Sequence, residues 1–360
     1  MSSARFTSGI ASHRRRNSSR FSLCPATKGF VTTVGTLHAL RFHLITPPPT
    51  PCYNPFTMRH FLLLVACLLP AADPAYQVVH GWPLLPDGFA FGHVSGVGVD
   101  SHNHVWVFHR GDRPILCFDG PSGKILASFG DGMFTTAHGL TLDRQDNIWI
   151  TDTGSHIVQK FSHKGELLLT LGAKGVPGLD PFHFNRPTDV AIGPDGAVYV
   201  SDGYGNNRVV KFDASGAYLT EWGSRGDKPG EFDLPHGIAA DARGRIYVAD
   251  RSNARVQVFE SNGKFIAQWK SPQLGRPWGL TARDGSIFVV DGGDMKPKPP
   301  DRGRVSRADP DGKILDQFGS FGSYDGQFYW AHDVAAGADG AVYVADVHLG
   351  MRIQKFLPRK

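Results

Sequence analysis

An internal repeat constrains the fold of this chain more than any other feature of its 360 residues. Each of six copies contains an apolar strand, a turn with Asp, Asn or Gly, a second strand that ends near Asp, and two further strands. Equivalent residues at the start of the first strand, called register residues below, recur 42 to 54 residues apart. A repeat of this length is typical of a four-stranded propeller blade.

The second strands of the copies indicate β-structure throughout. Segments such as VYVSD (198–202) and IYVAD (246–250) are alternating and β-branched or aromatic, which is typical of half-buried strands. Turns such as SNG and ASG suit tight hairpins, and no window of 11 residues past the leader keeps a helical period. We therefore expect an all-β, six-bladed β-propeller over 76–360, with an N-terminal strand near Tyr76 to Leu85 closing the ring.

The segment before the repeats resembles a targeting sequence. Met58 begins a short basic start, an apolar run at 61–69 and small residues before Tyr76, so 58–75 is interpreted as a signal peptide. The apolar run is too short for a stable membrane span, and we expect a secreted or periplasmic protein. Residues 1–57 are interpreted as a non-native or disordered extension, with a basic targeting segment as the alternative. A lipid anchor at Cys67 is disfavoured by the LLPAA that follows.

Charge and cysteine content argue against a nucleic-acid-binding protein and against a disulfide-stabilised domain. The first 75 residues carry a net charge of +7 and the whole chain +5, which leaves −2 for the repeats. The basic balance therefore belongs to the leader and gives no support for nucleic-acid binding. Cys117 is the one cysteine of the repeat region, so we expect no intramolecular disulfide there and interpret it as a small buried apolar residue.

Three of the six register residues are histidines, and they alternate around the predicted ring. They are His138, His236 and His332, and the intervening copies have Ser95, Thr188 and Trp278. Alternate blades of a six-bladed ring lie a third of a turn apart, so the three imidazoles face one axis. An open site of three neutral imidazoles is the ligand set that catalytic zinc prefers.

A second set of polar residues is predicted at the same mouth of the channel. Arg110, Tyr204 and Arg251 follow the ends of second strands, which lie beside the starts of their antiparallel neighbours. Arginines suit an anionic substrate group, and a tyrosine close to them and to a dication can act as a base. The recurring strand-end aspartates are interpreted as packing residues. His109, His156 and His348 break the three-fold pattern and are left out, and the loop at 292–303 is either a cover for the mouth or a surface insertion.

At these residues the chain resembles a known family. EWGSRGDKPGEFDLPHGIA and QFGSFGSYDGQFYWAHDVA resemble the connections of NHL repeats. The ordered set FHRGD, AHGL, PTDVA, SDGYGNNRVV, LPHGIA, VADRSNARVQ and AHDV resembles peptidyl-α-hydroxyglycine α-amidating lyase over about residues 90–358.

The resemblance implies roles for individual residues. It implies a catalytic Zn²⁺ on His138, His236 and His332, with Tyr204 as base and Arg110 and Arg251 in the active site. It also implies a structural Ca²⁺ on the backbone carbonyls of Val97 and Leu140 and the carboxylate of Asp333, all oxygen ligands. We expect no counterpart to the disulfides of animal members, since Gly205 follows Tyr204, and none to the copper hydroxylase to which animal enzymes are often fused.

The interpretation is a monomeric zinc lyase. It is expected to cleave the C–N bond of a small-molecule or peptide α-hydroxyglycine, giving a carboxamide and glyoxylate. One alternative is a non-catalytic NHL propeller that binds a peptide or glycan. Another is a lactonase-like metal hydrolase, which the histidines disfavour because such sites prefer carboxylate and Asn ligands.

Overall fold

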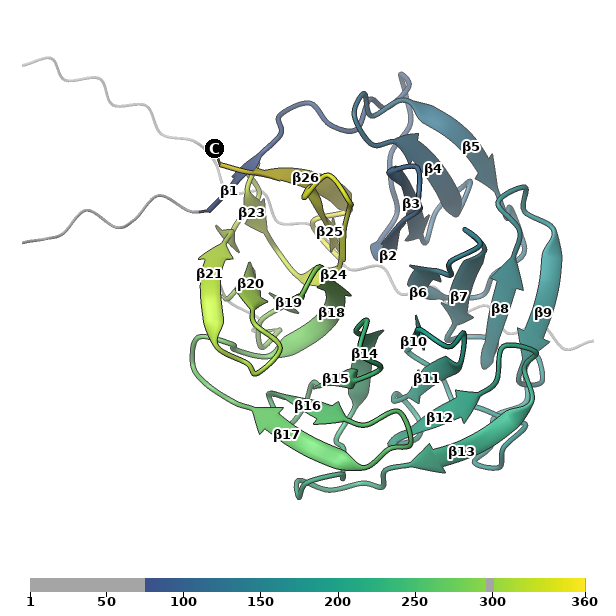
Figure 1. Ribbon diagram of the computed structural model, residues 1–360. Helices are drawn as coiled ribbons and strands as arrows, with labels where there is room; N and C mark the ends of the chain where they lie inside the picture. The colour runs from purple at the N-terminus through teal and green to yellow at the C-terminus, as the bar shows by residue number, and fades with distance from the viewer. Residues whose placement is uncertain (1–74, 296–300, 360) are drawn as a thin grey trace, which may run out of the picture. The chain divides into compact units, whose positions relative to one another are not determined.

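The computed structural model describes residues 75–295 and 301–359, which fall in the second of two compact units, Leu69–Lys360. These residues form six four-stranded sheets around a central channel and contain no α-helix (Figure 1). The all-β, six-bladed propeller is therefore confirmed. The segments predicted as extension (1–57) and signal peptide (58–75) lie outside the described residues, Ala75 excepted. Within the described part of the chain, no helix could cross a membrane.

Each blade runs from an innermost strand at the channel to an outermost strand at the rim. The innermost strands of blades 1 to 6 are β2 (Val94–Val99), β6 (Ala137–Leu142), β10 (Asp189–Ile192), β14 (Pro235–Ala240), β18 (Pro277–Arg283) and β24 (Ala331–Ala336). The second strands are β3 (His104–His109), β7 (Ile148–Asp152), β11 (Val198–Asp202), β15 (Ile246–Asp250), β19 (Ser286–Asp291) and β25 (Val342–Asp346). The third strands are β4 (Ile115–Asp119), β8 (Ile157–Phe161), β12 (Arg208–Phe212), β16 (Arg255–Phe259), β20 (Arg304–Ala308) and β26 (Arg352–Pro358). The outermost strands are β5 (Ile125–Phe129), β9 (Leu167–Leu171), β13 (Tyr218–Trp222), β17 (Phe265–Trp269), β21 (Ile314–Phe318) and β1 (Tyr76–Val78), and a short parallel pair, β22 (Ser320–Phe321) and β23 (Gln327–Phe328), precedes β24.

The core lies between the blades. Strands β7, β11, β15 and β25 are buried along their whole length, whereas an outermost strand such as β5 alternates between half-buried and exposed residues. Six apolar clusters each join two neighbouring blades, so both faces of a second strand are covered. Burial of apolar surface between blades therefore holds the ring together.

The aspartates at the ends of the second strands fix the connections that lead into each blade. Asp152 accepts hydrogen bonds from the amides of Thr135 and Thr136, and Asp202 accepts one from the amide of Asn185. In blade 1 the equivalent residue is His109, whose Nδ1 accepts from the amide of Gly92. This confirms their interpretation as packing residues and gives His109 the same structural role.

The N-terminal strand closes the ring as expected, but it is shorter than predicted. Strand β1 pairs antiparallel with β26 over Tyr76–Val78 only and forms the rim of blade 6. The chain then turns away, and Trp82 packs against Tyr343 while its indole N–H donates to the carbonyl of Gly120. The expected end at Leu85 was wrong because Trp82 fills the space between blades 6 and 1 and the following Pro83 has no N–H to donate.

Candidate metal centre and substrate pocket

The three register histidines stand at irregularities in the innermost strands. The pairing register shifts between Ala137 and Leu140, between Pro235 and Ile238, and between Ala331 and Asp333. The histidines lie inside these shifts, and a β-bulge at such a place redirects a side chain. His138, His236 and His332 are at most 4% exposed, and one ring nitrogen from each lies within 4.8 Å of the other two.

Backbone carbonyls of the intervening blades orient the three rings. The Nδ1–H of His138 donates to the carbonyl of Thr188 (2.6 Å), that of His236 to Trp278 (2.8 Å) and that of His332 to Ser95 (2.6 Å). A carbonyl only accepts, so Nδ1 has the proton and Nε2 is left as the ligand atom. Each non-histidine register residue therefore positions the histidine of the preceding blade.

The electrostatics of the cluster favour neutral imidazoles. Burial and the charge of Arg110 lower the pKa of His138 to about 3. Burial and the neighbouring histidine His138 also lower the pKa values of His236 and His332 well below the usual range. Three uncharged imidazoles with their Nε2 atoms converging are suited to a divalent transition metal such as zinc.

Tyr204 reaches the centre of this cluster. Its hydroxyl oxygen lies 3.0 Å from Nε2 of His138 and 3.0 Å from Nε2 of His236. The loop that presents it is held by the amides of Tyr204 and Gly205, which donate to the carbonyls of Arg186 and Asn185. A hydroxyl at this place is close enough to exchange a proton with a group bound beside the histidines.

Both predicted arginines line the pocket above the histidines. Arg251 is 8% exposed, and its guanidinium lies 3.4 Å from the centroid of the Trp278 ring. Arg110 is more exposed and its Nε donates to the carbonyl of Ala137. With Tyr204 and His332 they line a cavity of about 620 Å³ that opens to solvent. The structure thus brings all six residues predicted for the zinc site to one mouth.

Sequence reasoning missed an aromatic wall of the same pocket. The rings of Trp330 and His348 pack in a tilted arrangement with centroids 4.3 Å apart, and the ring centroid of His93 lies 5.7 Å from that of His348. His348 had been excluded because it breaks the three-fold pattern. Its position two residues after the strand-end Asp346 was the available signal, because residues there border the mouth.

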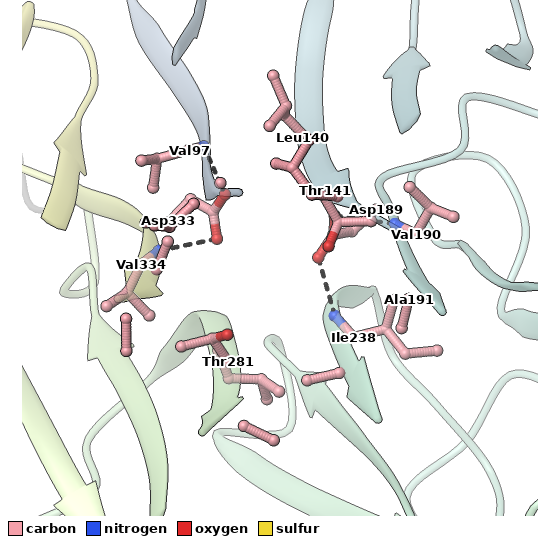
Figure 2. Close-up of a pocket in the computed structure, with 18 of the residues that line it drawn as sticks. Val97, Leu140, Thr141, Asp189, Val190, Ala191, Ile238, Thr281, Asp333 and Val334 are labelled. Carbon is pink, nitrogen blue, oxygen red and sulfur yellow. Dashed lines mark hydrogen bonds between the residues drawn. The ribbon is translucent and has the colours of Figure 1, made fainter. Parts of the chain in front are cut away.

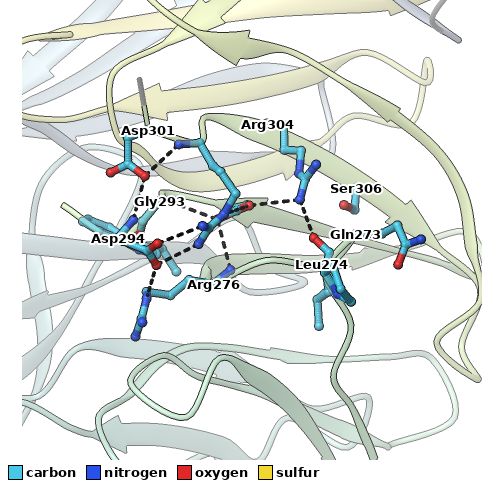
Figure 3. Close-up of polar contacts among 12 residues, drawn as sticks. Gln273, Leu274, Arg276, Gly293, Asp294, Asp301, Arg304 and Ser306 are labelled. Carbon is cyan, nitrogen blue, oxygen red and sulfur yellow. Dashed lines mark hydrogen bonds and ion pairs between the residues drawn. The ribbon is translucent and has the colours of Figure 1, made fainter. Parts of the chain in front are cut away.

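The loop at 292–303 begins and ends beside the pocket. Asp294 and Met295 line it, and the Nη2 of Arg251 lies 2.9 Å from the sulfur of Met295. On the other side of residues 296–300, which lie outside the described part, Arg302 donates to both carboxylate oxygens of Asp294, and Arg276 donates to it as well (Figure 3). Ion pairs therefore anchor both ends of this loop at the mouth.

The predicted calcium ligands lie deeper in the channel. Val97, Leu140 and Asp333 all line a cavity of about 190 Å³ enclosed by the innermost strands. Asp333 is 8% exposed and accepts hydrogen bonds from the amides of Val97 and Val334 (Figure 2). Burial raises its pKa to about 7.

A second carboxylate, which sequence reasoning missed, faces Asp333 across this cavity. Asp189 is also 8% exposed and accepts from the amides of Ile238 and Val190 (Figure 2). Burial and the charge of Asp333 raise its pKa well above the usual range. The signal was present, because the residue after the register residue is Asp in blades 3 and 6 and Gly in the other four. Carboxylates and carbonyls are the ligands that calcium prefers.

Comparison with known proteins finds relatives of this chain among proteins with NHL repeats and among amidating enzymes. Residues 134–161, 184–212 and 232–259 match the NHL repeat family. A peptidyl-glycine alpha-amidating monooxygenase of Mus musculus is 36% identical over 308 residues, 74% of this chain and 30% of the relative. NHL repeat-containing protein 3 of Homo sapiens is 33% identical over 70% of this chain and 72% of its own length. Peptidyl-alpha-hydroxyglycine alpha-amidating lyase 1 of Drosophila melanogaster is 30% identical over 79% of this chain and 60% of its own length.

The chain belongs to the NHL-repeat family that includes the α-amidating lyases. It spans about a third of the length of the amidating monooxygenases that it matches. A streptogramin B lyase (TM-score 0.55, 18% identity, 79% of this chain and 98% of that one) and a gluconolactonase of Xanthomonas campestris (0.57, 14%, 80% and 96%) share the fold. Members such as NHL repeat-containing protein 3 are named for their repeats alone, so membership of the family does not by itself specify a reaction.

Proposed function

We propose that this protein is a zinc-dependent lyase that cleaves the C–N bond of a peptidyl- or N-acyl-α-hydroxyglycine to give a carboxamide and glyoxylate. The observation that carries the proposal is the convergence of three buried, neutral imidazoles with the hydroxyl of Tyr204, 3.0 Å from two of them, beneath two arginines. The names of the amidating relatives add support. The carboxylate-rich site expected for a lactonase-like hydrolase is not favoured, because the ligand set at the mouth is histidine.

The three histidines fit zinc as ligands through their Nε2 atoms. Their Nδ1–H groups are already engaged by carbonyls, which fixes both the tautomer and the direction of each ring. When bound, zinc supplies a Lewis acid that polarises an oxygen of the substrate and makes a hydroxyl more acidic.

Tyr204 is the proposed base. Its side-chain oxygen shares the pocket with Arg110 and Arg251 and would take the proton of the substrate's carbinol hydroxyl. The electron pair of the O–H bond forms the C=O of glyoxylate, the C–N bond breaks, and the amide nitrogen takes up a proton. The reaction consumes no water and no oxidant, so atoms and electrons balance within one substrate.

The arginines are proposed to bind the substrate's carboxylate. Arg251 is buried against Trp278, which holds its guanidinium rigid, and Arg110 completes the cationic rim. A guanidinium can bind a carboxylate through two parallel hydrogen bonds. The α-hydroxyglycine would thereby be oriented with its carbinol toward Tyr204 and the histidines.

The channel is proposed to bind a structural Ca²⁺. Its ligands would be the carboxylate of Asp333 and the backbone carbonyls of Val97 and Leu140, with Asp189 as the opposing carboxylate. Two buried carboxylates facing one cavity are unfavourable unless they are protonated or matched by a cation. The site would tie blades 1, 2, 3 and 6 together, and export directed by residues 58–75 would bring it into a calcium-rich compartment.

An assay for glyoxylate tests the lyase proposal. Purified protein is incubated with an N-acyl-α-hydroxyglycine, and glyoxylate and carboxamide are measured against the uncatalysed background. Equal release of both products, abolished by a chelator and restored by zinc, is the expected result. A rate equal to background in zinc-loaded protein would overturn the proposal.

A further inference from the structure

Opposite the catalytic mouth, the hairpin turn of blade 1 brings two imidazoles and a carboxylate together. Asp100, His102 and His104 each have a ligand atom within 4.8 Å of the other two. The turn joins β2 to β3 and borders a cavity of about 520 Å³ at the far end of the channel. We propose that this turn, together with Asp146 of the neighbouring blade, is a second transition-metal site, specific to blade 1.

The turn is built on a scaffold that other blades share. In blade 2 the amides of Gln145 and Asn147 donate to Oδ1 of Asp143, and in blade 4 the turn after Asp241 does the same. In blade 1 the amides of His102 and His104 donate to Oδ1 of Asp100, at 2.9 and 2.8 Å. These bonds fix the carboxylate and place the side chains two and four residues later beside it.

Part of the cluster is explained by this scaffold alone. The residue four positions after the aspartate contacts its carboxylate in all three blades, as His104, Asn147 or Arg245. The contact between Nδ1 of His104 and Oδ2 of Asp100, at 3.0 Å, therefore occurs without any metal. A ligand role for His104 needs further support from the residues around it.

His102 supplies that support, because its side chain takes no part in the bonds that build the scaffold, and its Nδ1 lies 3.2 Å from the hydroxyl oxygen of Ser101. Blades 2 and 4 have Gln145 and Arg243 at its position. Its side chain is 70% exposed, yet its ring lies nearly parallel to that of His104, with centroids 5.7 Å apart and an interplanar angle of 15°. Its Nδ1 is 3.5 Å from Oδ2 of Asp146, a residue of the β6–β7 turn in blade 2.

The four groups form a ligand set suited to zinc. They provide two imidazole nitrogens and two carboxylate oxygens, which can surround a small dication at about 2.0–2.2 Å. The two carboxylates match its charge, and the ion would take the place of the contact between His104 and Asp100. Asp146 is already held in place, because Ser101 donates to it through its amide and its hydroxyl. A bound ion would thus join the turns of blades 1 and 2.

Counting bound zinc in matched variants tests the site. Metal-free protein is titrated with Zn²⁺ by calorimetry, and bound zinc is measured by mass spectrometry after gel filtration. The expected result is two ions per chain for the parent and one for His102→Ala, with glyoxylate release unchanged. His163→Ala, which removes another exposed histidine, is the matched control and should keep both ions.

A second variant separates this inference from the proposed function. His236→Ala alters the catalytic cluster and leaves the blade 1 turn intact. It should therefore lose the ion at the mouth and keep the ion at the turn, whereas His102→Ala should lose the ion at the turn and keep the ion at the mouth. If the catalytic site bound no zinc, the parent would still bind one ion and His102→Ala none. The same zinc count in His102→Ala and the parent, whatever its value, would overturn the second site.

Discussion

The mouth and the interior of the channel use neighbouring residues of the same strands for opposite chemistry. At the mouth, the register residue is His in the alternate blades 2, 4 and 6, so three side chains meet. One residue further along, Asp occupies the opposite blades 3 and 6, so two carboxylates face each other (Figure 2). One scaffold therefore yields a three-fold nitrogen site and a two-fold oxygen site, depending on which blades have the polar residue.

Burial acts on both sites but shifts the pKa values of their side chains in opposite directions. It lowers the pKa values of the histidines, which makes them neutral and ready to bind at any pH near 7. It raises the pKa values of Asp189 and Asp333, so cation binding there must displace protons. Two of the glycines in the other blades leave space for these carboxylates. A Cβ on Gly139 would collide with Asp189, and one on Gly279 would lie 2.9 Å from Asp333 Oδ1.

Removing a histidine should abolish metal binding at the mouth and leave calcium binding in the interior of the channel unchanged. For His236→Ala we expect loss of zinc at the mouth and a fall in kcat/KM of about 10³-fold or more, because Lewis-acid stabilisation contributes several kcal/mol. Glyoxylate release and metal content measure this, and calcium binding should be unchanged. Full activity in this variant would show that the chemistry lies elsewhere.

Removing only the hydroxyl of Tyr204 should remove the proposed base without removing the metal. For Tyr204→Phe we expect kcat to fall by about 10²- to 10⁴-fold, the usual contribution of a positioned acid or base, while the zinc content stays at the parental value. Tyr324→Phe, at an exposed tyrosine, serves as the control. Loss of zinc together with activity would assign Tyr204 a structural role instead.

The interior should respond to pH and calcium in a way that the mouth does not. Both carboxyls have ordinary pKa values near 4 in the unfolded chain, whereas in the folded, calcium-free protein the pKa of Asp333 is about 7 and that of Asp189 is raised by burial and by the charge of Asp333. Folded-state pKa values above the unfolded ones mean that stability falls as pH rises from about 4 through about 7, the folded-state pKa of Asp333. We expect a loss on the order of a few kcal/mol, measurable by denaturant unfolding at each pH, and calcium should reverse it.

The variant Asp189→Asn should be more stable than the parent without calcium and less stable than the parent with calcium. Without calcium, at a pH above the pKa values of both carboxyls, it removes the repulsion with Asp333 and should be more stable than the parent. With calcium at about 100 times its Kd, the parent should gain about 2.7 kcal/mol, and the variant should gain much less. Asp87→Asn, at an exposed aspartate, is the matched control. A calcium response equal to that of the parent would exclude Asp189 from the site.

Much of this comparison was readable in the sequence, because a propeller repeats one backbone. Once the copies are aligned, His138, His236 and His332 must share a level of the channel, and Arg110, Tyr204 and Arg251 must share its mouth. The aspartate pair could have been found by the same alignment, since Asp189 and Asp333 replace glycine in opposite blades.

Other features could not be predicted, because they depend on backbone groups and packing rather than on residue type. The carbonyls of Ser95, Thr188 and Trp278 orient the histidines, and any residue has a carbonyl. The contact of the Trp330 ring with the His348 ring joins a connection to a strand end and follows no repeat. The early end of β1 depends on where Trp82 finds space between two blades.

The two arginines should differ in their effect, because the structure holds them differently. Arg251 is buried and stacks on Trp278, whereas Arg110 is more exposed and contacts one carbonyl. Lysine cannot stack or bind a carboxylate through two parallel bonds. We therefore expect kcat/KM to fall about tenfold for Arg251→Lys, as for loss of one charged hydrogen bond, and less for Arg110→Lys. The loss should appear mainly in KM if the arginines bind the substrate's carboxylate, and an equal fall in kcat would instead place their effect in the transition state.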